Sequence, residues 1–291
     1  MKTRILIAVI LSTLGLQPLV LLRAATTIDS ANRYAYGANL GWMDGVADTN
    51  NGAVIGEYIC SGYVYSANVG WINLGSGSPA NSIQYQNNAA NDFGVNNDGL
   101  GNLRGYAYGA NIGWINFENT GAPRANLATG QLGGYAWSAN CGWISLSNSV
   151  AYVQTDSIRQ GTLAPDGLPI AWLLQNFGTT NVNASADPTG KGMTIGQDYL
   201  AGTDPNNTNS LLRITAESFT TGGTNASLTW NSVPTRFYYL RKNPALDATN
   251  WTDSGLGLVS PSGGSATTAG FTDTNAPVRF YRVQAVRPLT P

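Results

Sequence analysis

The sequence predicts a mainly β protein with three parts: a duplicated β-hairpin repeat domain, a small helix-loop-helix module and a C-terminal β-sandwich. Hydrophobic residues make up 43% of the 291 residues and charged residues only 11%. Such a composition, rich in Gly, Asn, Ser and Thr, suits strands and tight turns better than solvated helices. A motif of aromatic residues followed by Ala-Asn-x-Gly-Trp occurs four times. The last quarter of the chain has short strand-like runs separated by turn residues.

Residues 1–25 have the order of a secretory signal peptide. Two basic residues precede an apolar stretch from 5 to 22, and two alanines follow it. Retention as an uncleaved membrane anchor is the alternative, because Leu22 and Arg23 fit poorly before a cleaved alanine. No later stretch approaches the roughly 20 apolar residues that a membrane-spanning helix needs. We therefore expect a secreted or cell-surface protein with no membrane span after the signal segment.

Charge and composition exclude some classes of function. The formal net charge is -1, and no run of lysine or arginine could neutralise a row of phosphates. Nucleic acid is therefore not an expected partner. The chain contains no histidine, which removes the commonest base and metal ligand at neutral pH.

An internal repeat organises residues 26–150. The four motif copies end in tryptophans spaced by 29, 43 and 29 residues: Trp42, Trp71, Trp114 and Trp143. The copies thus form pairs that recur after 72 residues. Gly37 and Gly109 stand in the first copy of each pair, and Ser66 and Ser138 in the second. This alternation is expected if a two-motif unit was duplicated whole.

Each copy predicts a β-hairpin whose turn is Ala-Asn-x-Gly. The turn asparagines are expected to tolerate left-handed backbone angles, and the turn glycines lack the Cβ that would clash there. These asparagines are Asn39, Asn68, Asn111 and Asn140, and the glycines are Gly41, Gly70, Gly113 and Gly142.

Strand periodicity places the aliphatic residues after each tryptophan on a core face and the aromatic residues on the other face. The aromatic face has two interpretations. It forms a second buried layer between hairpins, which is the usual role of aromatic residues at repeat spacing, or it is a partly open platform that stacks on sugars. The platform residues are Trp42, Trp71, Trp114, Trp143, Tyr65, Tyr108 and Trp137.

The only two cysteines, Cys60 and Cys141, both lie in the repeat domain. An even number of cysteines in an exported protein favours a disulfide between them.

Residues 151–165 are expected to be a linker, and residues 166–209 a small module. Within this module, 170–177 and 193–200 have helical patterns. They flank a polar loop that contains Asp187, Gly190 and Gly192.

The stretch from Asp187 to Pro205, which ends in Tyr-Leu-Ala-Gly-Thr-Asp-Pro, resembles the dockerin-like, thrombospondin type 3-like calcium modules of secreted bacterial surface proteins. The resemblance covers about 166–205 and implies Ca²⁺ as a cofactor. The implied ligand residues are Asp187, Thr189, Met193 and Asp198. The family usually has a carboxylate where Lys191 stands, and an ammonium cannot coordinate a cation. The loop is therefore a degenerate calcium loop that we expect to bind the ion weakly or not at all.

Residues 210–288 contain strand-like runs, and the last one begins at Phe280. The order of these runs resembles the fibronectin type III-like β-sandwich that often follows the calcium module in exported proteins.

These features together predict an exported structural or adhesive cell-surface protein without catalytic activity. Its expected partners are polysaccharide or other surface proteins. A carbohydrate-binding protein that uses the repeat-domain aromatics is the alternative, and a degenerate glycoside hydrolase is the third reading. The carboxylates for such a hydrolase share no spacing or context that specifies a site; they are Glu57, Asp92, Glu118, Asp156 and Glu217.

Overall fold

The computed structural model describes residues 26–220, 225–246, 249–273 and 280–290. The predicted signal peptide lies outside the described residues. The described chain is mainly β, and it forms two compact units, residues 26–182 with 289–290 and residues 183–288. No helix in the described part of the chain is both long and apolar enough to cross a membrane.

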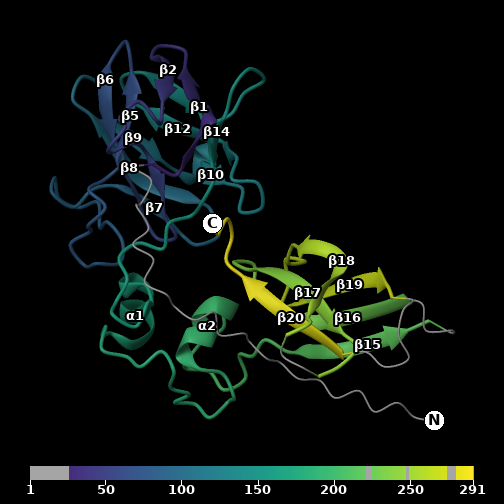
Figure 1. Cartoon of the computed structure of the whole chain (residues 1–291). Coiled ribbons are helices and arrows are strands. Elements are labelled where there is room, and N and C mark those ends of the chain that lie inside the picture. The colour runs from purple at the N-terminus through teal and green to yellow at the C-terminus, as the bar shows by residue number, and fades with distance from the viewer. Residues whose placement is uncertain (1–25, 221–224, 247–248, 274–279, 291) are drawn as a thin grey trace, which may run out of the picture. The chain divides into compact units, whose positions relative to one another are not determined.

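The repeat domain is a closed antiparallel barrel of eight strands (Figure 1). Each motif copy forms one hairpin, and neighbouring hairpins pair in chain order. The last strand also pairs with the first, so the wall of the barrel has no free edge. In order, the strands are β1 (Ile28–Gly37), β2 (Gly41–Asp44), β5 (Tyr63–Ser66), β6 (Gly70–Asn73), β8 (Leu103–Gly109), β9 (Gly113–Phe117), β12 (Tyr135–Ser138) and β13 (Gly142–Ser145).

Short strands extend the barrel. β7 (Val95–Asn97) pairs with β8, and β14 (Val153–Thr155) pairs with β1. β14 lies in the segment expected to be a linker, and Val153 is part of the barrel core. The remaining short elements are β3 (Val54–Ile55), which pairs with β4 (Cys60–Ser61), β10 (Arg124–Ala125), which pairs with β11 (Leu132–Gly133), and a 3₁₀ turn at Asn119–Gly121.

The interior follows one rule in all four hairpins: a smaller residue on the first strand faces a larger one on the second. An eight-stranded barrel is just wide enough for its interior to be filled by side chains. The facing pairs are Ala35 with Met43, Val64 with Ile72, Ala107 with Ile115 and Ala136 with Ile144. The core face predicted for the returning strands is therefore confirmed, because Ile72, Ile115 and Ile144 are buried in this core.

The four hairpin turns close one end of the barrel core. In each turn, the residue before the glycine packs into this core; these residues are Leu40, Val69, Ile112 and Cys141. A Cβ on Gly109 would lie 2.9 Å from Ile112 Cγ1, and one on Gly37 would lie 3.2 Å from Leu40 Cδ1. The two hairpins that carry serine at this position have the smaller turn residues, valine and cysteine. The Gly and Ser alternation thus complements the size of the turn residue.

The turn asparagines link neighbouring hairpins. Each side-chain amide donates a hydrogen bond of 2.9–3.1 Å to a carbonyl of the preceding turn, and the first turn bonds to the fourth. The bonds join Asn39 to Cys141, Asn68 to Leu40, Asn111 to Val69 and Asn140 to Ile112. We call this set the asparagine ring.

The turn asparagines do not adopt the left-handed backbone angles that they were expected to tolerate. Among the described residues other than glycine, only Ser82, Asn87, Ala122 and Leu289 have positive φ. The turn glycines alone meet that requirement, with φ of 70–81°. The asparagine side chains are thus used for bonds between turns.

Two short helices follow the barrel. α1 (Ile170–Phe177) has the predicted bounds and ends at Gly178 in a left-handed conformation. α2 (Ile195–Ala201) begins at Thr194, which forms a capping box with Gln197, and ends at Gly202. α1 belongs to the barrel unit and α2 to the C-terminal unit, so the boundary between the units falls between these two helices.

The C-terminal unit contains two three-stranded antiparallel sheets around a core with Leu228, Trp230 and Leu240. One sheet is β15 (Ile214–Phe219), β16 (Asn225–Asn231) and β19 (Ala266–Thr272), and the other is β18 (Thr252–Val259), β17 (Phe237–Asn243) and β20 (Phe280–Val286). The sequence did not indicate β18, whose Gly-rich segment lacks a strong apolar alternation.

Candidate functional site: an aromatic belt on the barrel

The outer wall of the barrel carries three aromatic residues from every hairpin. Because strand side chains alternate between faces, residues that flank the small interior position point outward. The four trios are Tyr34, Tyr36 and Trp42; Tyr63, Tyr65 and Trp71; Tyr106, Tyr108 and Trp114; and Tyr135, Trp137 and Trp143. We call these twelve residues the aromatic belt.

The four trios have nearly the same geometry. In each, the tryptophan ring centroid lies 4.8–4.9 Å from the second aromatic ring and 6.0–6.3 Å from the first. Most contacts are edge-on, the arrangement that aromatic quadrupoles favour. The belt therefore presents one aromatic arrangement four times around the barrel.

The belt tryptophans are exposed, which makes the second buried layer a wrong interpretation. Trp42, Trp71 and Trp143 are 46% exposed and Trp114 is 47% exposed. A closed barrel has a single interior, and here aliphatic side chains fill it, so the aromatic face lies outside. The predicted platform residues Tyr65, Tyr108 and Trp137 are also exposed. Among the described residues, Phe93 is the one aromatic outside the belt that packs against it, 5.0 Å from Trp114.

Polar side chains separate the trios. Asn73 is opposite Tyr63 in its own hairpin and opposite Tyr108 in the next. The equivalent positions hold Asp44, Asn116 and Ser145. Asp44 is the one charged residue of these four, and it pairs with Arg33 at 3.1 Å. The belt thus alternates rings with hydrogen-bonding groups and carries little net charge.

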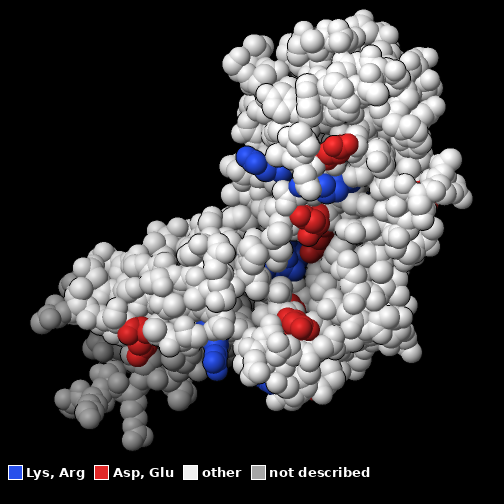
Figure 2. All heavy atoms as spheres, turned by 180° about the vertical axis from the view of Figure 1, so that it is seen from behind, with Lys and Arg blue, Asp and Glu red and all other residues white. Residues whose placement is uncertain are grey.

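Figure 2 shows the same scarcity of charge on a larger scale. Most of the surface on the face drawn is formed by uncharged residues, and the red and blue side chains are few. Because large exposed apolar patches mark interaction sites, the aromatic belt is a candidate interaction surface.

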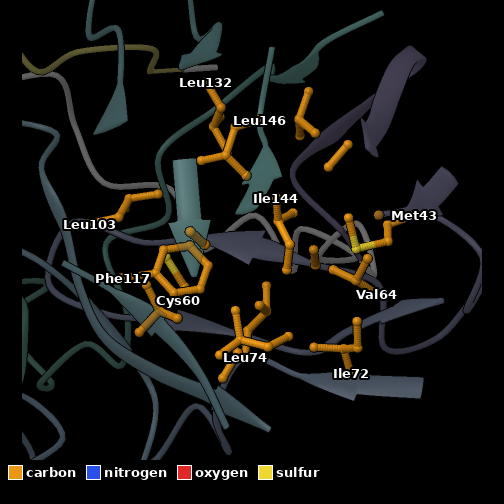
Figure 3. Close-up of a pocket in the computed structure, with 18 of the residues that line it drawn as sticks. Met43, Cys60, Val64, Ile72, Leu74, Leu103, Phe117, Leu132, Ile144 and Leu146 are labelled. Carbon is orange, nitrogen blue, oxygen red and sulfur yellow. The ribbon is translucent and has the colours of Figure 1, made fainter. Parts of the chain in front are cut away.

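The barrel interior holds an apolar cavity of about 80 Å³ (Figure 3). Leu74, Leu103, Phe117 and Ile144 line it together with the Cys60 thiol. Burial raises the pKa of Cys60 to about 12, so the thiol is neutral and a poor nucleophile at physiological pH. The cavity is a small packing space with almost no polar group to orient a ligand.

The predicted disulfide is absent, because Cys60 and Cys141 are both buried free thiols. The two residues occupy different elements of the core. Cys141 stands in a hairpin turn at the position that Leu40 and Ile112 fill elsewhere, whereas Cys60 begins β4 and is paired with Ile55. Both thiols therefore act as small apolar side chains.

The implied calcium loop does not fit the ion. Asp187 accepts hydrogen bonds from the backbone N–H of Lys191 and Gly192 and from the Thr189 hydroxyl. Desolvation opposes these donors, but they lower the pKa of Asp187 below its usual value. The Met193 side chain is buried in the C-terminal core. The Asp198 carboxylate lies 2.8 Å from the Lys191 ammonium, which stands where a cation would be needed.

Other acidic residues are also occupied by the fold. Asp98 accepts hydrogen bonds from the backbone of Leu100 and Asn102 in its own turn. The buried Asp92 accepts bonds from the backbone of Ala80 and Gln86. Within the described residues, no three His, Cys, Asp or Glu side chains are grouped so that they could hold a metal ion.

A second cavity, of about 330 Å³, was not indicated by any sequence motif. It lies in the barrel unit and is lined by residues that include Glu57, Tyr58, Pro79, Arg159 and Ile170. These residues come from segments far apart in the chain, so only the folded chain brings them together.

No family model matches this chain, and neither a curated protein nor a solved structure matches it.

Proposed function

We propose that this chain is an exported, non-catalytic adhesion protein whose barrel binds polysaccharide through the aromatic belt. The observation that carries the proposal is the exposure of four tryptophans in four copies of one ring arrangement. The signal-like residues 1–25 support export. The fibronectin type III-like assignment of 210–288 belongs to the same proposal and agrees with a spacer role.

Ring exposure favours a sugar ligand on chemical grounds. Aromatic faces stack on the C–H faces of pyranose rings, and tyrosine and tryptophan combine a large apolar surface with a polar group. The polar residues between the trios can donate to or accept from sugar hydroxyls. An uncharged belt suits a neutral glycan, for which no electrostatic attraction is needed.

Geometry also indicates several sites on one barrel. The trios lie on successive hairpins of a closed wall, so they face different directions around the barrel axis. One glycan chain cannot lie on all four at once. We therefore propose that the barrel is multivalent and binds polysaccharide surfaces through avidity.

Retention on insoluble polysaccharides, together with affinity electrophoresis in soluble ones, tests the proposal. We expect the full chain to be retained, each single Trp→Ala variant in the belt to be retained less, and the variant with all four substitutions to be lost. Phe219→Ala is the matched control, because that ring is 40% exposed but lies in β15, outside the belt.

Retention of the fourfold variant at the wild-type level would exclude the belt as the site. Failure of the wild-type chain to bind any polysaccharide would reject the proposal in favour of a structural role, in which the belt contacts other surface proteins.

A further inference from the structure

The Lys191 side chain is almost fully buried in the loop that resembles a calcium module. Its side chain is 1% exposed, and its ammonium lies 2.8 Å from an oxygen of Asp198, whose side chain is 2% exposed. The same ammonium donates to the backbone carbonyls of Asp204 at 2.6 Å, Ser210 at 3.1 Å and Asn207 at 3.3 Å. Four oxygens from two segments of chain therefore surround one positive charge.

We propose that the Lys191 ammonium is a built-in replacement for a bound metal ion, so that this module closes without calcium. One carboxylate and several carbonyl oxygens around a cation are the ligand types that hard metal ions prefer. Here a covalently attached –NH₃⁺ group lies among these oxygens and donates to them through its three N–H groups, which the four acceptors share.

The contacts of Lys191 explain what the replacement accomplishes. They join the 187–198 loop to the 204–210 turn, and the Asp204 N–H also donates to the Ser210 hydroxyl at 2.9 Å. Since the charge belongs to the chain, this closure does not depend on the concentration of a free ion. Removal of only one partner of a buried ion pair strongly destabilises the folded protein, because the other charge is left buried without a partner.

The neighbouring helix transmits this closure to the sheets of the same unit. Asp198 lies in α2, and the Arg236 guanidinium donates to the carbonyls of Tyr199 at 2.6 Å and Leu200 at 2.9 Å. Because Arg236 precedes β17, the C-terminal end of α2 is fastened to the sheet region. The module and the sheets should therefore unfold together, and the test uses the full chain.

Calorimetric melting of the wild type and of Lys191→Ala, each in excess EDTA and in millimolar CaCl₂, tests the proposal. We expect the wild-type Tm to be the same in both solutions. Lys191→Ala should have a lower Tm in EDTA, and added CaCl₂ should raise that Tm, because the vacated space keeps one carboxylate and three carbonyls. A ligand that binds only the folded state raises Tm with concentration.

Lys242→Ala is the matched control. Lys242 also pairs with an aspartate, Asp273 at 3.3 Å, but its side chain is 29% exposed. Its loss should lower Tm less and should produce no dependence on calcium.

Three results would overturn the proposal: a wild-type Tm that falls in EDTA, a Lys191→Ala variant that is as stable in EDTA as the wild type, or a folded Lys191→Ala variant whose Tm does not rise in CaCl₂. If Lys191→Ala does not fold in either solution, the Tm of Asp198→Asn tests the proposal instead, because this variant keeps the ammonium and removes the carboxylate charge. We expect it to lower Tm more than Asp273→Asn, and an equal or smaller loss would contradict the proposal.

Discussion

The effect of Trp114→Ala on the free energy of unfolding distinguishes an exposed belt from a buried aromatic layer. Removal of a fully buried tryptophan costs about 3–5 kcal/mol, because transfer energy is lost and a cavity remains. Trp114 is 47% exposed, so roughly half of the transfer energy applies, and water fills the vacated space. Its edge contacts with Tyr106 and Tyr108 add a share of the about 0.5–1.5 kcal/mol typical of aromatic pairs.

We therefore expect Trp114→Ala to lower the free energy of unfolding by about 1–2 kcal/mol. The corresponding fall in Tm is roughly 2–8 °C for a unit of this size. Trp143→Ala should cost less, because no ring equivalent to Phe93 is seen against it among the described residues.

Urea unfolding followed by circular dichroism measures these losses, with Trp172→Ala as the control in the same unit. Trp172 is 8% exposed in α1, so its removal should cost about 3–5 kcal/mol. If Trp114→Ala were as costly as Trp172→Ala, the belt ring would be buried in solution and the reasoning would be refuted.

Three further predictions concern the barrel. Asn111→Ala removes the amide that donates to the Val69 carbonyl and should cost about 1 kcal/mol in urea unfolding; no loss would mean that the asparagine ring contributes nothing. Gly109→Ala should lower the free energy of unfolding by about 1–3 kcal/mol, because its Cβ would lie 2.9 Å from Ile112. Gly133→Ala is the control and should lower it clearly less, because no atom of the described residues lies within 4 Å of a Cβ at that position. Iodoacetamide at mildly alkaline pH should leave Cys60 unmodified in the folded chain, because burial raises the pKa of this thiol to about 12. In denaturant it should alkylate both cysteines. Rapid labelling of Cys60 in the folded chain, or a disulfide detected by intact mass, would contradict the structure.

The hairpins could be predicted from the sequence because their signals are local. Ala-Asn-x-Gly places a turn between two strand-like runs, and the glycine has to adopt positive φ. The aliphatic residue after each tryptophan could also be assigned to the core from the period of two. These signals involve residues that are close in the chain.

Closure of the barrel could not be predicted in the same way. It depends on the pairing of Tyr36 with Ser145 and of Gly37 with Ile144. The paired residues are more than one hundred positions apart, and no sequence motif indicates that they pair. Without closure, the aromatic face could equally have been covered by a second sheet. The number of copies was the unused signal, since four hairpins supply the eight strands whose barrel interior is filled by side chains alone.

The alternation of glycine and serine hairpins follows from packing at the turn end of the barrel. Leu40 and Ile112 are large and need glycine at the facing position, because a Cβ there would approach them to 2.9–3.2 Å. Val69 and Cys141 are smaller and leave space for the Ser66 and Ser138 side chains, which are fully buried. A barrel with four glycine hairpins would bring four large turn side chains to one narrow end. A barrel with four serine hairpins would instead bury four serine hydroxyls there. The Ser66 hydroxyl donates to the Leu40 carbonyl of the preceding turn, whereas the equally buried Ser138 hydroxyl has no hydrogen-bond partner among the described residues. The serine hairpins therefore share the packing at this position but not the bond. Size complementarity at the turn end thus makes the repeating unit of this barrel a pair of unlike hairpins.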